Sequence, residues 1–262
     1  MPNAVIVDVV RTAGGRRNGV LSGWHPVDLA AEVLMALQKR NNLDPSLVDD
    51  VIMGCVMQVG AQGLNIGRNA VLAAGWPDSV PATTIDRQCG SSQQAYTFAA
   101  QGVMAGAYDV VVAAGVEEMS LVPMGASVSK GVGFPFTEGM NDRYIDQGGL
   151  VPQGISAEMI ADQWGLSRED LDAFGARSQQ FAERARDEGR FDNEIIPVQG
   201  RRRDKETGEV TIEDAPVTQD EGIRPGTTAE GLAKLKPAFK PDVGKVTAAN
   251  SSQITDGASA AL

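Results

Sequence analysis

A strand-like run, a polar turn and a helix start follow one another in the stretch Thr83-Thr84-Ile85-Asp86-Arg87-Gln88-Cys89-Gly90-Ser91-Ser92. A cysteine in such a turn lies before a helix whose first N–H groups lack partners within the helix and whose dipole favours an anion. This placement favours the thiolate, which is the nucleophilic form of cysteine. The N–H of Cys89 is a candidate donor to a tetrahedral oxyanion. The same residues also fit a small buried core thiol, so the spacing alone leaves both interpretations open.

Strand and helix patterns alternate on either side of this stretch, and such alternation is typical of an α/β layered fold. The β-branched run 4–10 predicts a strand covered on both faces. Pro26 opens a predicted helix that repeats Leu29, Val33 and Leu37 on one face. Further strands are expected at 51–59, 83–87 and 110–114, and further helices at 66–74 and 91–105.

The composition changes near residue 120, after which the chain is more polar up to about residue 245. Helices are expected at 156–164 and after Ser167, an N-cap with Asp170 three residues on. The second helix is expected to bury Leu171, Phe174, Phe181 and Ala185 and to end at Gly189. Residues 205–208 predict a hairpin turn. We therefore predict two domains, 1–119 with 246–262 and an inserted α+β loop domain at 120–245. The apolar run 257–262 resembles an interrupted strand and suggests a truncated chain.

Composition excludes several classes of function. The 262-residue chain has a formal charge of −11, which argues against nucleic acid as a partner. It has no apolar run of the ~20 residues that span a bilayer and does not begin like a signal peptide, so no membrane role and a cytoplasmic location are expected. Cys55, Cys89 and the single His25 are too few for a zinc site. Cys55 is expected to be a core thiol and His25 a capping or surface residue.

Several ordered motifs carry a resemblance to the thiolase family. The segment around Cys89 is similar to the family's Cys-x-Ser-Gly/Ser turn after a short strand. The other matching segments are Val5-Ile6-Val7 with Arg11-Thr12, Gly115-Val116-Glu117-Glu118-Met119-Ser120, Gly154-Ile155-Ser156-Ala157-Glu158, Leu235-Lys236-Pro237-Ala238-Phe239, Val246-Thr247-Ala248-Ala249-Asn250-Ser251-Ser252 and Asp256-Gly257-Ala258. Together they extend over essentially the whole chain.

The resemblance implies a thiolase-like layered α-β-α half-fold, a loop domain that binds coenzyme A, and an acyl-enzyme on Cys89. It implies thiolytic cleavage of 3-ketoacyl-CoA, or the reverse condensation of acetyl-CoA. No covalently bound cofactor is implied, because coenzyme A and acyl-CoA are substrates. A homodimer or homotetramer is implied, with the strand at 83–87 as a pairing edge. The implied coenzyme contacts are Arg224, Thr227, Leu235, Phe239, Ala248 and Ser252, with Gln179 and Met140 as further candidates.

The chain also departs from the family. The family's Gly-His-Pro histidine, its oxyanion-hole asparagine and its second catalytic cysteine have no match in this sequence. One alternative is therefore a non-catalytic fragment that binds coenzyme A or serves assembly. Another is a ketosynthase-type condensing enzyme, which shares the fold and a cysteine at the same turn. The coenzyme segments between Arg224 and Ser252 argue against the second alternative.

Overall fold

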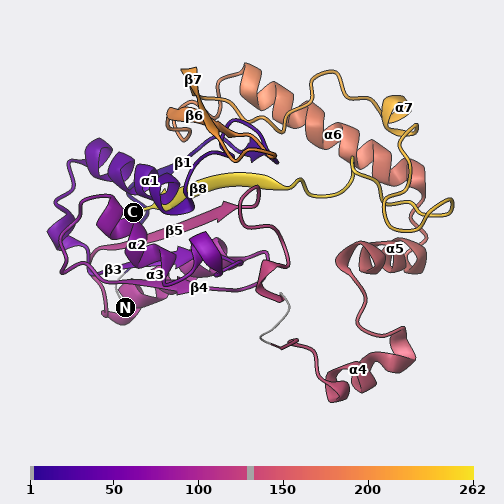
Figure 1. The fold of residues 1–262 in the computed structure, drawn as a ribbon, viewed down its shortest axis with the longest axis horizontal. Coiled ribbons are helices and arrows are strands. Elements are labelled where there is room, and N and C mark those ends of the chain that lie inside the picture. The colour runs from indigo at the N-terminus through magenta and orange to yellow at the C-terminus, as the bar shows by residue number, and fades with distance from the viewer. Residues whose placement is uncertain (1–2, 129–132) are drawn as a thin grey trace. The chain divides into compact units, whose positions relative to one another are not determined.

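The computed structural model describes residues 3–128 and 133–262, which form two compact units (Figure 1). The first unit comprises Met1–Ser127, Phe191–Gly222 and Ile254–Leu262, and the second comprises Val128–Arg190 and Ile223–Gln253. The α/β class expected from the sequence is confirmed. No described helix has the length and apolar character needed to cross a membrane.

A six-stranded mixed sheet forms the centre of the first unit, with five strands in the order β1-β8-β5-β3-β4 and β2 paired to β8. β3 pairs in parallel with β4 and β5, whereas β8 runs antiparallel to β1, β2 and β5. The strands are β1 (Val9–Arg11), β2 (Gly15–Arg16), β3 (Asp50–Gly54), β4 (Ala82–Ile85), β5 (Val111–Glu118) and β8 (Thr255–Ala261).

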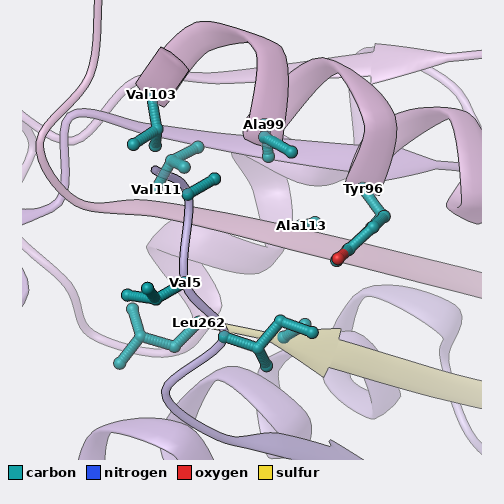
Figure 2. A pocket seen from close by; sticks show the side chains of 11 residues that line it. Val5, Tyr96, Ala99, Val103, Val111, Ala113 and Leu262 are labelled. Atoms are coloured by element: carbon teal, nitrogen blue, oxygen red, sulfur yellow. The ribbon is translucent and has the colours of Figure 1, made fainter. Parts of the chain in front are cut away.

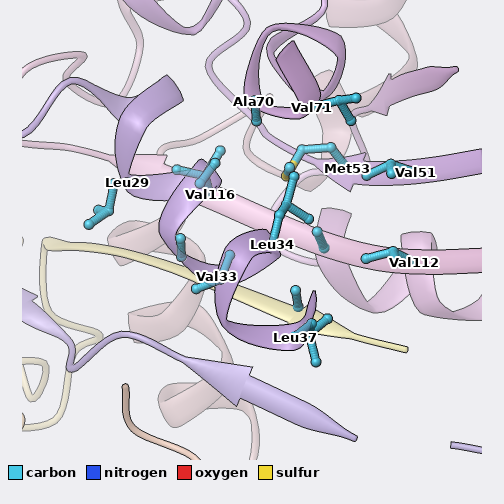
Figure 3. Packing of buried hydrophobic residues seen from close by; sticks show 14 of the residues in the cluster. Leu29, Val33, Leu34, Leu37, Val51, Met53, Ala70, Val71, Val112 and Val116 are labelled. Atoms are coloured by element: carbon cyan, nitrogen blue, oxygen red, sulfur yellow. The ribbon is translucent and has the colours of Figure 1, made fainter. Parts of the chain in front are cut away.

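Three helices cover this sheet because its strands alternate apolar side chains between two faces. They are α1 (Pro26–Asn41), α2 (Ile66–Ala73) and α3 (Ser91–Ala105). Val51 and Met53 of β3 join one buried cluster with α1 and α2, whereas Ile52 joins another with α3. Figure 3 shows the first cluster, in which Leu34 of α1 lies beside Met53. The sheet is therefore a layer between α1 and α2 on one face and α3 on the other.

The helix predictions for this unit are confirmed, whereas two strand predictions are wrong in their extent. The strand expected at 51–59 ends at Gly54. Helix 91–105 matches α3, and the helix from Pro26 buries Leu29, Val33 and Leu37 as expected. Of the run 4–10, only Val9 and Val10 lie in β1, and Val5 is 76% exposed. The strand is not covered on both faces because β1 lies at one end of the sheet order. The principal strand contacts of α3 are instead with β3, β4 and β5.

A hairpin formed by β6 (Val198–Arg203) and β7 (Val210–Val217) belongs to the first unit. Its turn contains residues 205–208, as the sequence predicted. Arg201 N–H donates to Val20 O (2.7 Å), and Gly23 N–H donates to Arg201 O (2.7 Å). The compact units thus differ from the predicted division into 1–119 with 246–262 and 120–245, because residues 191–222 pack with the sheet. The assignment of 120–245 to a coenzyme-binding domain stays a prediction.

The second unit contains four described α-helices, α4 (Glu138–Tyr144), α5 (Gln153–Gln163), α6 (Arg168–Asp187) and α7 (Ala229–Leu232). Ser167 caps α6 in a capping box with Asp170, as predicted. The predicted burial of Phe174 and Phe181 is wrong, since they are 62% and 54% exposed. Small residues face inward instead. A Cβ on Gly175 would lie 2.9 Å from Ala249 O, so only a glycine allows this close packing.

The described part of the chain also contains short 3₁₀ turns, at Pro45–Leu47, Gly60–Gln62, Ala126–Val128 and Ile145–Gln147.

Candidate active site

Cys89 lies in a tight turn between β4 and α3 in the first unit. Gly90 N–H donates to Arg87 O (2.7 Å) and closes the turn, while Arg87 N–H donates to Ser91 Oγ (3.0 Å). Cys89 has a φ of 61°, in the left-handed region that non-glycine residues rarely adopt. This conformation leaves the cysteine exposed. The turn therefore presents the sulfur outward at the start of a helix.

Two glycines bring the start of α3 against the sheet. Gly54 of β3 and Gly115 of β5 are direct neighbours in the parallel register. A Cβ on Gly54 would lie 2.2 Å from Ser92 N, and one on Gly115 would lie 2.5 Å from Ser92 Cβ. Any larger residue at either position would displace the first turn of α3, so this glycine pair fixes where the cysteine turn lies.

The first turn of α3 offers backbone donors beside Cys89. Gly90 is the N-cap residue and supplies no side-chain acceptor to the first N–H groups of the helix. Such groups bind anions and developing negative charge. This is the arrangement that the sequence predicted for Cys89, and an anion-stabilising role for these N–H groups stays a prediction.

A cavity of about 430 Å³ opens beside Cys89. Its wall combines glycines, among them Gly54, Gly115 and Gly257, with apolar side chains. The apolar lining includes Val56, Met57, Val116, Met119, Met124 and Ala258, and the charged lining consists of Arg11, Glu117 and Asp256. The volume falls within the range of small-molecule sites. The cavity can accept an acyl group next to the exposed sulfur.

Glu117 shapes one wall of this cavity. Its Oε2 accepts from Val56 N–H (2.8 Å), and its Oε1 accepts from Met57 N–H (3.2 Å) and Gln62 Nε2 (2.8 Å). The loop after β3 is thus tied to the end of β5. The sequence placed Glu117 in a family motif without giving it a role, because its partners are 55 or more positions away.

Cys55 and His25, the other candidate nucleophile and base, are both committed to the structure of the fold. Cys55 is 1% exposed and belongs to the main core cluster, as expected. Burial, then the charges of Glu117 and Asp86, raise the pKa of the Cys55 thiol to about 12. His25 caps α1, accepting from Val27 N–H at its Nδ1 (3.3 Å). Neither residue is a candidate nucleophile or base in this structure.

A second, apolar cavity lies along α3 on the face away from α1 and α2. Figure 2 shows Tyr96, Ala99 and Val103 of α3 above Val5 and Leu262. Tyr96 contributes the only titratable side chain in its lining among the described residues. No cysteine in the described part of the chain lines this cavity, so the cavity beside Cys89 is the candidate active site.

All eight predicted coenzyme contacts belong to the second unit. Three of them come together at α6: Arg224 N–H donates to Gln179 Oε1 (2.9 Å), and Thr227 Oγ1 donates to Arg224 O (2.7 Å). Phe239 packs its ring on Gly154, where a Cβ would lie 2.3 Å from the ring. Leu235, Phe239, Ala248, Ser252 and Met140 are exposed. No ligand contact tests these residues, so their role stays a prediction.

Glu158 organises the segment that carries two of these candidates, and the sequence did not single out its side chain for this role. It is 1% exposed, and its carboxylate accepts from Lys245 N–H (2.9 Å) and Val246 N–H (2.8 Å). These bonds hold the start of the segment that contains Ala248 and Ser252. The signal in the sequence was a glutamate inside an otherwise small and apolar helix start at 154–158.

An exposed cysteine at a strand-to-helix turn, beside a cavity with apolar walls in an α/β unit, defines a candidate for covalent catalysis through a thiolate. The family model of the thiolase N-terminal domain matches residues 4–262. The chain belongs to the thiolase family.

The names of similar proteins agree with this assignment. The chain is 44% identical over 268 residues to the steroid 3-ketoacyl-CoA thiolase FadA6 of Mycobacterium tuberculosis, covering 100% of this chain and 62% of that protein. It is 45% identical to a 3-ketoacyl-CoA thiolase of Aliivibrio fischeri and 46% identical to one of Aliivibrio salmonicida, each over 264 residues. Each of these matches covers 100% of this chain and 64% of the relative. The chain thus spans less than two thirds of the length of these relatives.

Proposed function

We propose that this chain provides the nucleophile and the coenzyme-binding part of a 3-ketoacyl-CoA thiolase. The observation that carries the proposal is the exposed Cys89, held at φ 61° beside a cavity, in a chain whose relatives bear that name. The same chemistry run in reverse condenses acetyl-CoA with an acyl-CoA, which is a second acetyl-CoA when the product is acetoacetyl-CoA.

The proposed reaction has two half-reactions through one acyl-enzyme. The Cys89 thiolate attacks the C3 carbonyl of 3-ketoacyl-CoA and forms a thioester, while the C2–C3 bond breaks. The released acetyl-CoA carbanion takes up a proton. Free coenzyme A then gives up its thiol proton, and its sulfur attacks the thioester, takes the shortened acyl group and releases Cys89 as the thiolate. The first-turn N–H groups of α3 and that of Cys89 are suited to stabilise the tetrahedral oxyanions.

The second unit would bind the nucleotide end of coenzyme A through Arg224 and Thr227, with Gln179 as a further contact. A guanidinium suits phosphate or adenine. Leu235 and Phe239 would provide apolar contacts, and Ala248 and Ser252 would lie along the pantetheine arm, with Met140 as a further contact. The exposure of Leu235 and Phe239, 39% and 42%, supports this role because a ligand can reach them.

The physiological setting is part of the same proposal. We infer fatty-acid β-oxidation in the cytoplasm, and a homodimer or homotetramer. The end position of β4 in the sheet order supports pairing of its edge with a second copy.

One observation favours a second candidate, a chain that binds coenzyme A without turnover. Its single histidine, His25, is used to cap α1. Acyl transfer by thiolates commonly uses a neighbouring base. In this second candidate, coenzyme A binds to the second unit and Cys89 is not acylated.

The test combines acyl trapping with a binding measurement. The chain is incubated with acetyl-CoA or a 3-ketoacyl-CoA, quenched in acid and digested, and the acylated peptide is identified by mass. We expect the acyl group on Cys89, its loss in Cys89→Ala, and its retention in Cys55→Ala. A label on Cys55 would overturn the assignment.

A measurement of coenzyme A binding distinguishes the two candidate functions. The second candidate would be favoured if calorimetry shows that coenzyme A binds to Cys89→Ala while the unmodified chain is not acylated. Loss of both binding and acylation would reject both. Acyl-carrier protein tested as the donor distinguishes a ketosynthase-type enzyme, which would be acylated by it in preference to acyl-CoA.

A further inference from the structure

Two carboxyl groups face each other inside the first unit. Glu118 at the end of β5 and Asp256 on β8 are direct partners in the antiparallel register. Their exposed fractions are 0% and 1%. Asp256 lines the cavity beside Cys89. Two ionised carboxylates at such a position would repel each other in a region of low dielectric constant.

The hydrogen bonds around the pair are unequal. Asp256 accepts from the N–H of Ser120 (2.8 Å) and from its hydroxyl (2.5 Å). Ser120 Oγ in turn accepts from Asn18 N–H (2.7 Å). Neither carboxyl oxygen of an ionised Glu118 has a donor among the described residues. Asp256 is the direct cross-strand partner of Glu118, so a protonated Glu118 would have an acceptor beside it. One proton between the two groups removes the repulsion of two buried negative charges and gives Glu118 a hydrogen that Asp256 can accept.

Burial and hydrogen bonds, rather than the charges that face the pair, decide which group carries the proton. The charge of Arg203 on β6 lowers the pKa of Glu118, and the charge of Glu221, after β7, raises that of Asp256, so these two charges act in the opposite sense. Burial, followed by the charge and the hydrogen bond of Asp256, raises the pKa of Glu118 to about 10. Burial also raises the pKa of Asp256, but the two bonds from Ser120 favour its charged form. The proton therefore belongs to Glu118.

We propose that Glu118 and Asp256 share a single proton, and that this pair positions Ser120 and the turn at Asn18 in the wall of the Cys89 cavity. Glu118 is a positioning residue that acts through Asp256. Its carboxyl hydrogen gives Asp256 a further donor beside the N–H and the hydroxyl of Ser120. The inference goes beyond the proposed acyl transfer and does not depend on it.

The pair gives the fold a defined pH dependence. A carboxyl group whose pKa is raised on folding stabilises the protein fully below its unfolded value of 4.5, and this contribution is lost as the pH rises toward the folded value of about 10. Over that interval the unfolding equilibrium constant rises by up to about tenfold per pH unit. A glutamine at this position keeps a donor and cannot ionise, so it removes this dependence.

The first experiment measures unfolding by urea from pH 6 to pH 9 for the unmodified chain and Glu118→Gln. The unfolding constant of the unmodified chain, divided by that of Glu118→Gln, is expected to rise with pH by up to about tenfold per unit. Glu118→Gln should therefore be the more stable protein at the alkaline end. Equal pH dependence in the two proteins would show that Glu118 is ionised in the folded state and would overturn the proposal.

The second experiment tests positioning through amide hydrogen exchange at Ser120 and Asn18, comparing Glu118→Gln with Glu118→Leu at pH 7. Leucine fills the space without a donor. We expect protection to be kept with glutamine and lost at least tenfold with leucine. Equal protection in both variants would mean that Glu118 only fills space and would overturn the positioning role. Should the leucine variant not fold, loss of protection in Glu118→Gln would count against the proposal, and its retention would support it.

Discussion

Cys89 owes its exposure to a backbone conformation that is unfavourable for any residue with a Cβ. A left-handed φ in a non-glycine residue costs about 1–3 kcal/mol and persists only where the surrounding structure holds it. Here the hydrogen bonds from Gly90 to Arg87 and from Arg87 to Ser91 hold the turn. A glycine at position 89 would relieve the strain but would remove the sulfur. The strain therefore indicates that the side chain itself is required.

The two cysteines are expected to differ sharply in reactivity. Cys89 is exposed, whereas Cys55 is buried and its pKa of about 12 keeps its thiol protonated at neutral pH. Because the thiolate is the reactive form, iodoacetamide at pH 7.5 should modify Cys89 in the folded chain, and Cys55 only after unfolding in guanidinium. Peptide masses after a time course measure this. Cys55→Ala should keep the fast modification and Cys89→Ala should lose it. Rapid native labelling of Cys55 would contradict the structure.

At the scale of elements, the position of α3 depends on the glycine pair Gly54 and Gly115 rather than on its own sequence. Gly54→Ala should shift the first turn of α3, because the added Cβ would lie 2.2 Å from Ser92 N. We expect a loss of about 1–3 kcal/mol in the free energy of unfolding, typical of overpacking, and slower alkylation of Cys89. Urea unfolding and the alkylation rate measure the two effects.

Gly139→Ala is the matched control for this substitution. Gly139 lies in α4 of the second unit, and a Cβ there would meet nothing within 4 Å. Alanine is the better helix former by about 1 kcal/mol, so this variant should be as stable as the unmodified chain or slightly more stable. A Gly54→Ala variant with unchanged stability and unchanged Cys89 reactivity would show that α3 does not rest on this glycine pair.

Elements with local signals could be predicted from the sequence, and those that depend on distant partners could not. Pro26 and the N-cap Ser167 mark helix starts within a few residues, so these helices were placed correctly. The exposure of Val5 depends on where β1 lies in the sheet, and that of Phe174 on which face of α6 packs inward. Neither is encoded in the local pattern of apolar residues.

The same reasoning applies to the site. Cys89 could be found because its strand, turn and helix are contiguous. The opposition of Glu118 and Asp256 could not, because the antiparallel pairing of β5 with β8 joins residues more than a hundred positions apart. The adjacent acidic residues Glu117 and Glu118 were visible in the sequence. Only the fold shows that one holds the loop after β3 and that the other faces a second carboxyl group.

At the scale of the whole molecule, the first unit is assembled from three separate parts of the chain. Arg11 connects two of them. Its guanidinium donates to both oxygens of Asp220 (2.7 and 3.0 Å) and to Glu194 (2.7 Å). Asp220 also accepts from Gly14 N–H (2.7 Å). The loop that lines the Cys89 cavity is thereby held by residues about two hundred positions away.

This connection predicts a specific loss of stability in acid. Burial tends to raise the pKa of Asp220, but the hydrogen bonds from Arg11 and Gly14 and the Arg11 charge outweigh it and hold the pKa below 3.8. A carboxylate with a lowered pKa stabilises the fold above its unfolded value, and this contribution is lost as the pH falls through its folded value. Asp220→Asn should therefore lower the free energy of unfolding by about 1–3 kcal/mol at pH 7, with the difference shrinking as the pH falls below about 3.8.

Urea unfolding of the two proteins between pH 3 and pH 8 measures this difference. Asp214→Asn, at an exposed position of β7, is the matched control and should change the free energy of unfolding by less than about 0.5 kcal/mol. A difference between Asp220→Asn and the unmodified chain that stayed constant down to pH 3 would mean that the Asp220 charge is not what joins these parts. The loop beside Cys89 would then be held by its backbone contacts alone, and Asp220→Asn should leave the alkylation rate of Cys89 unchanged.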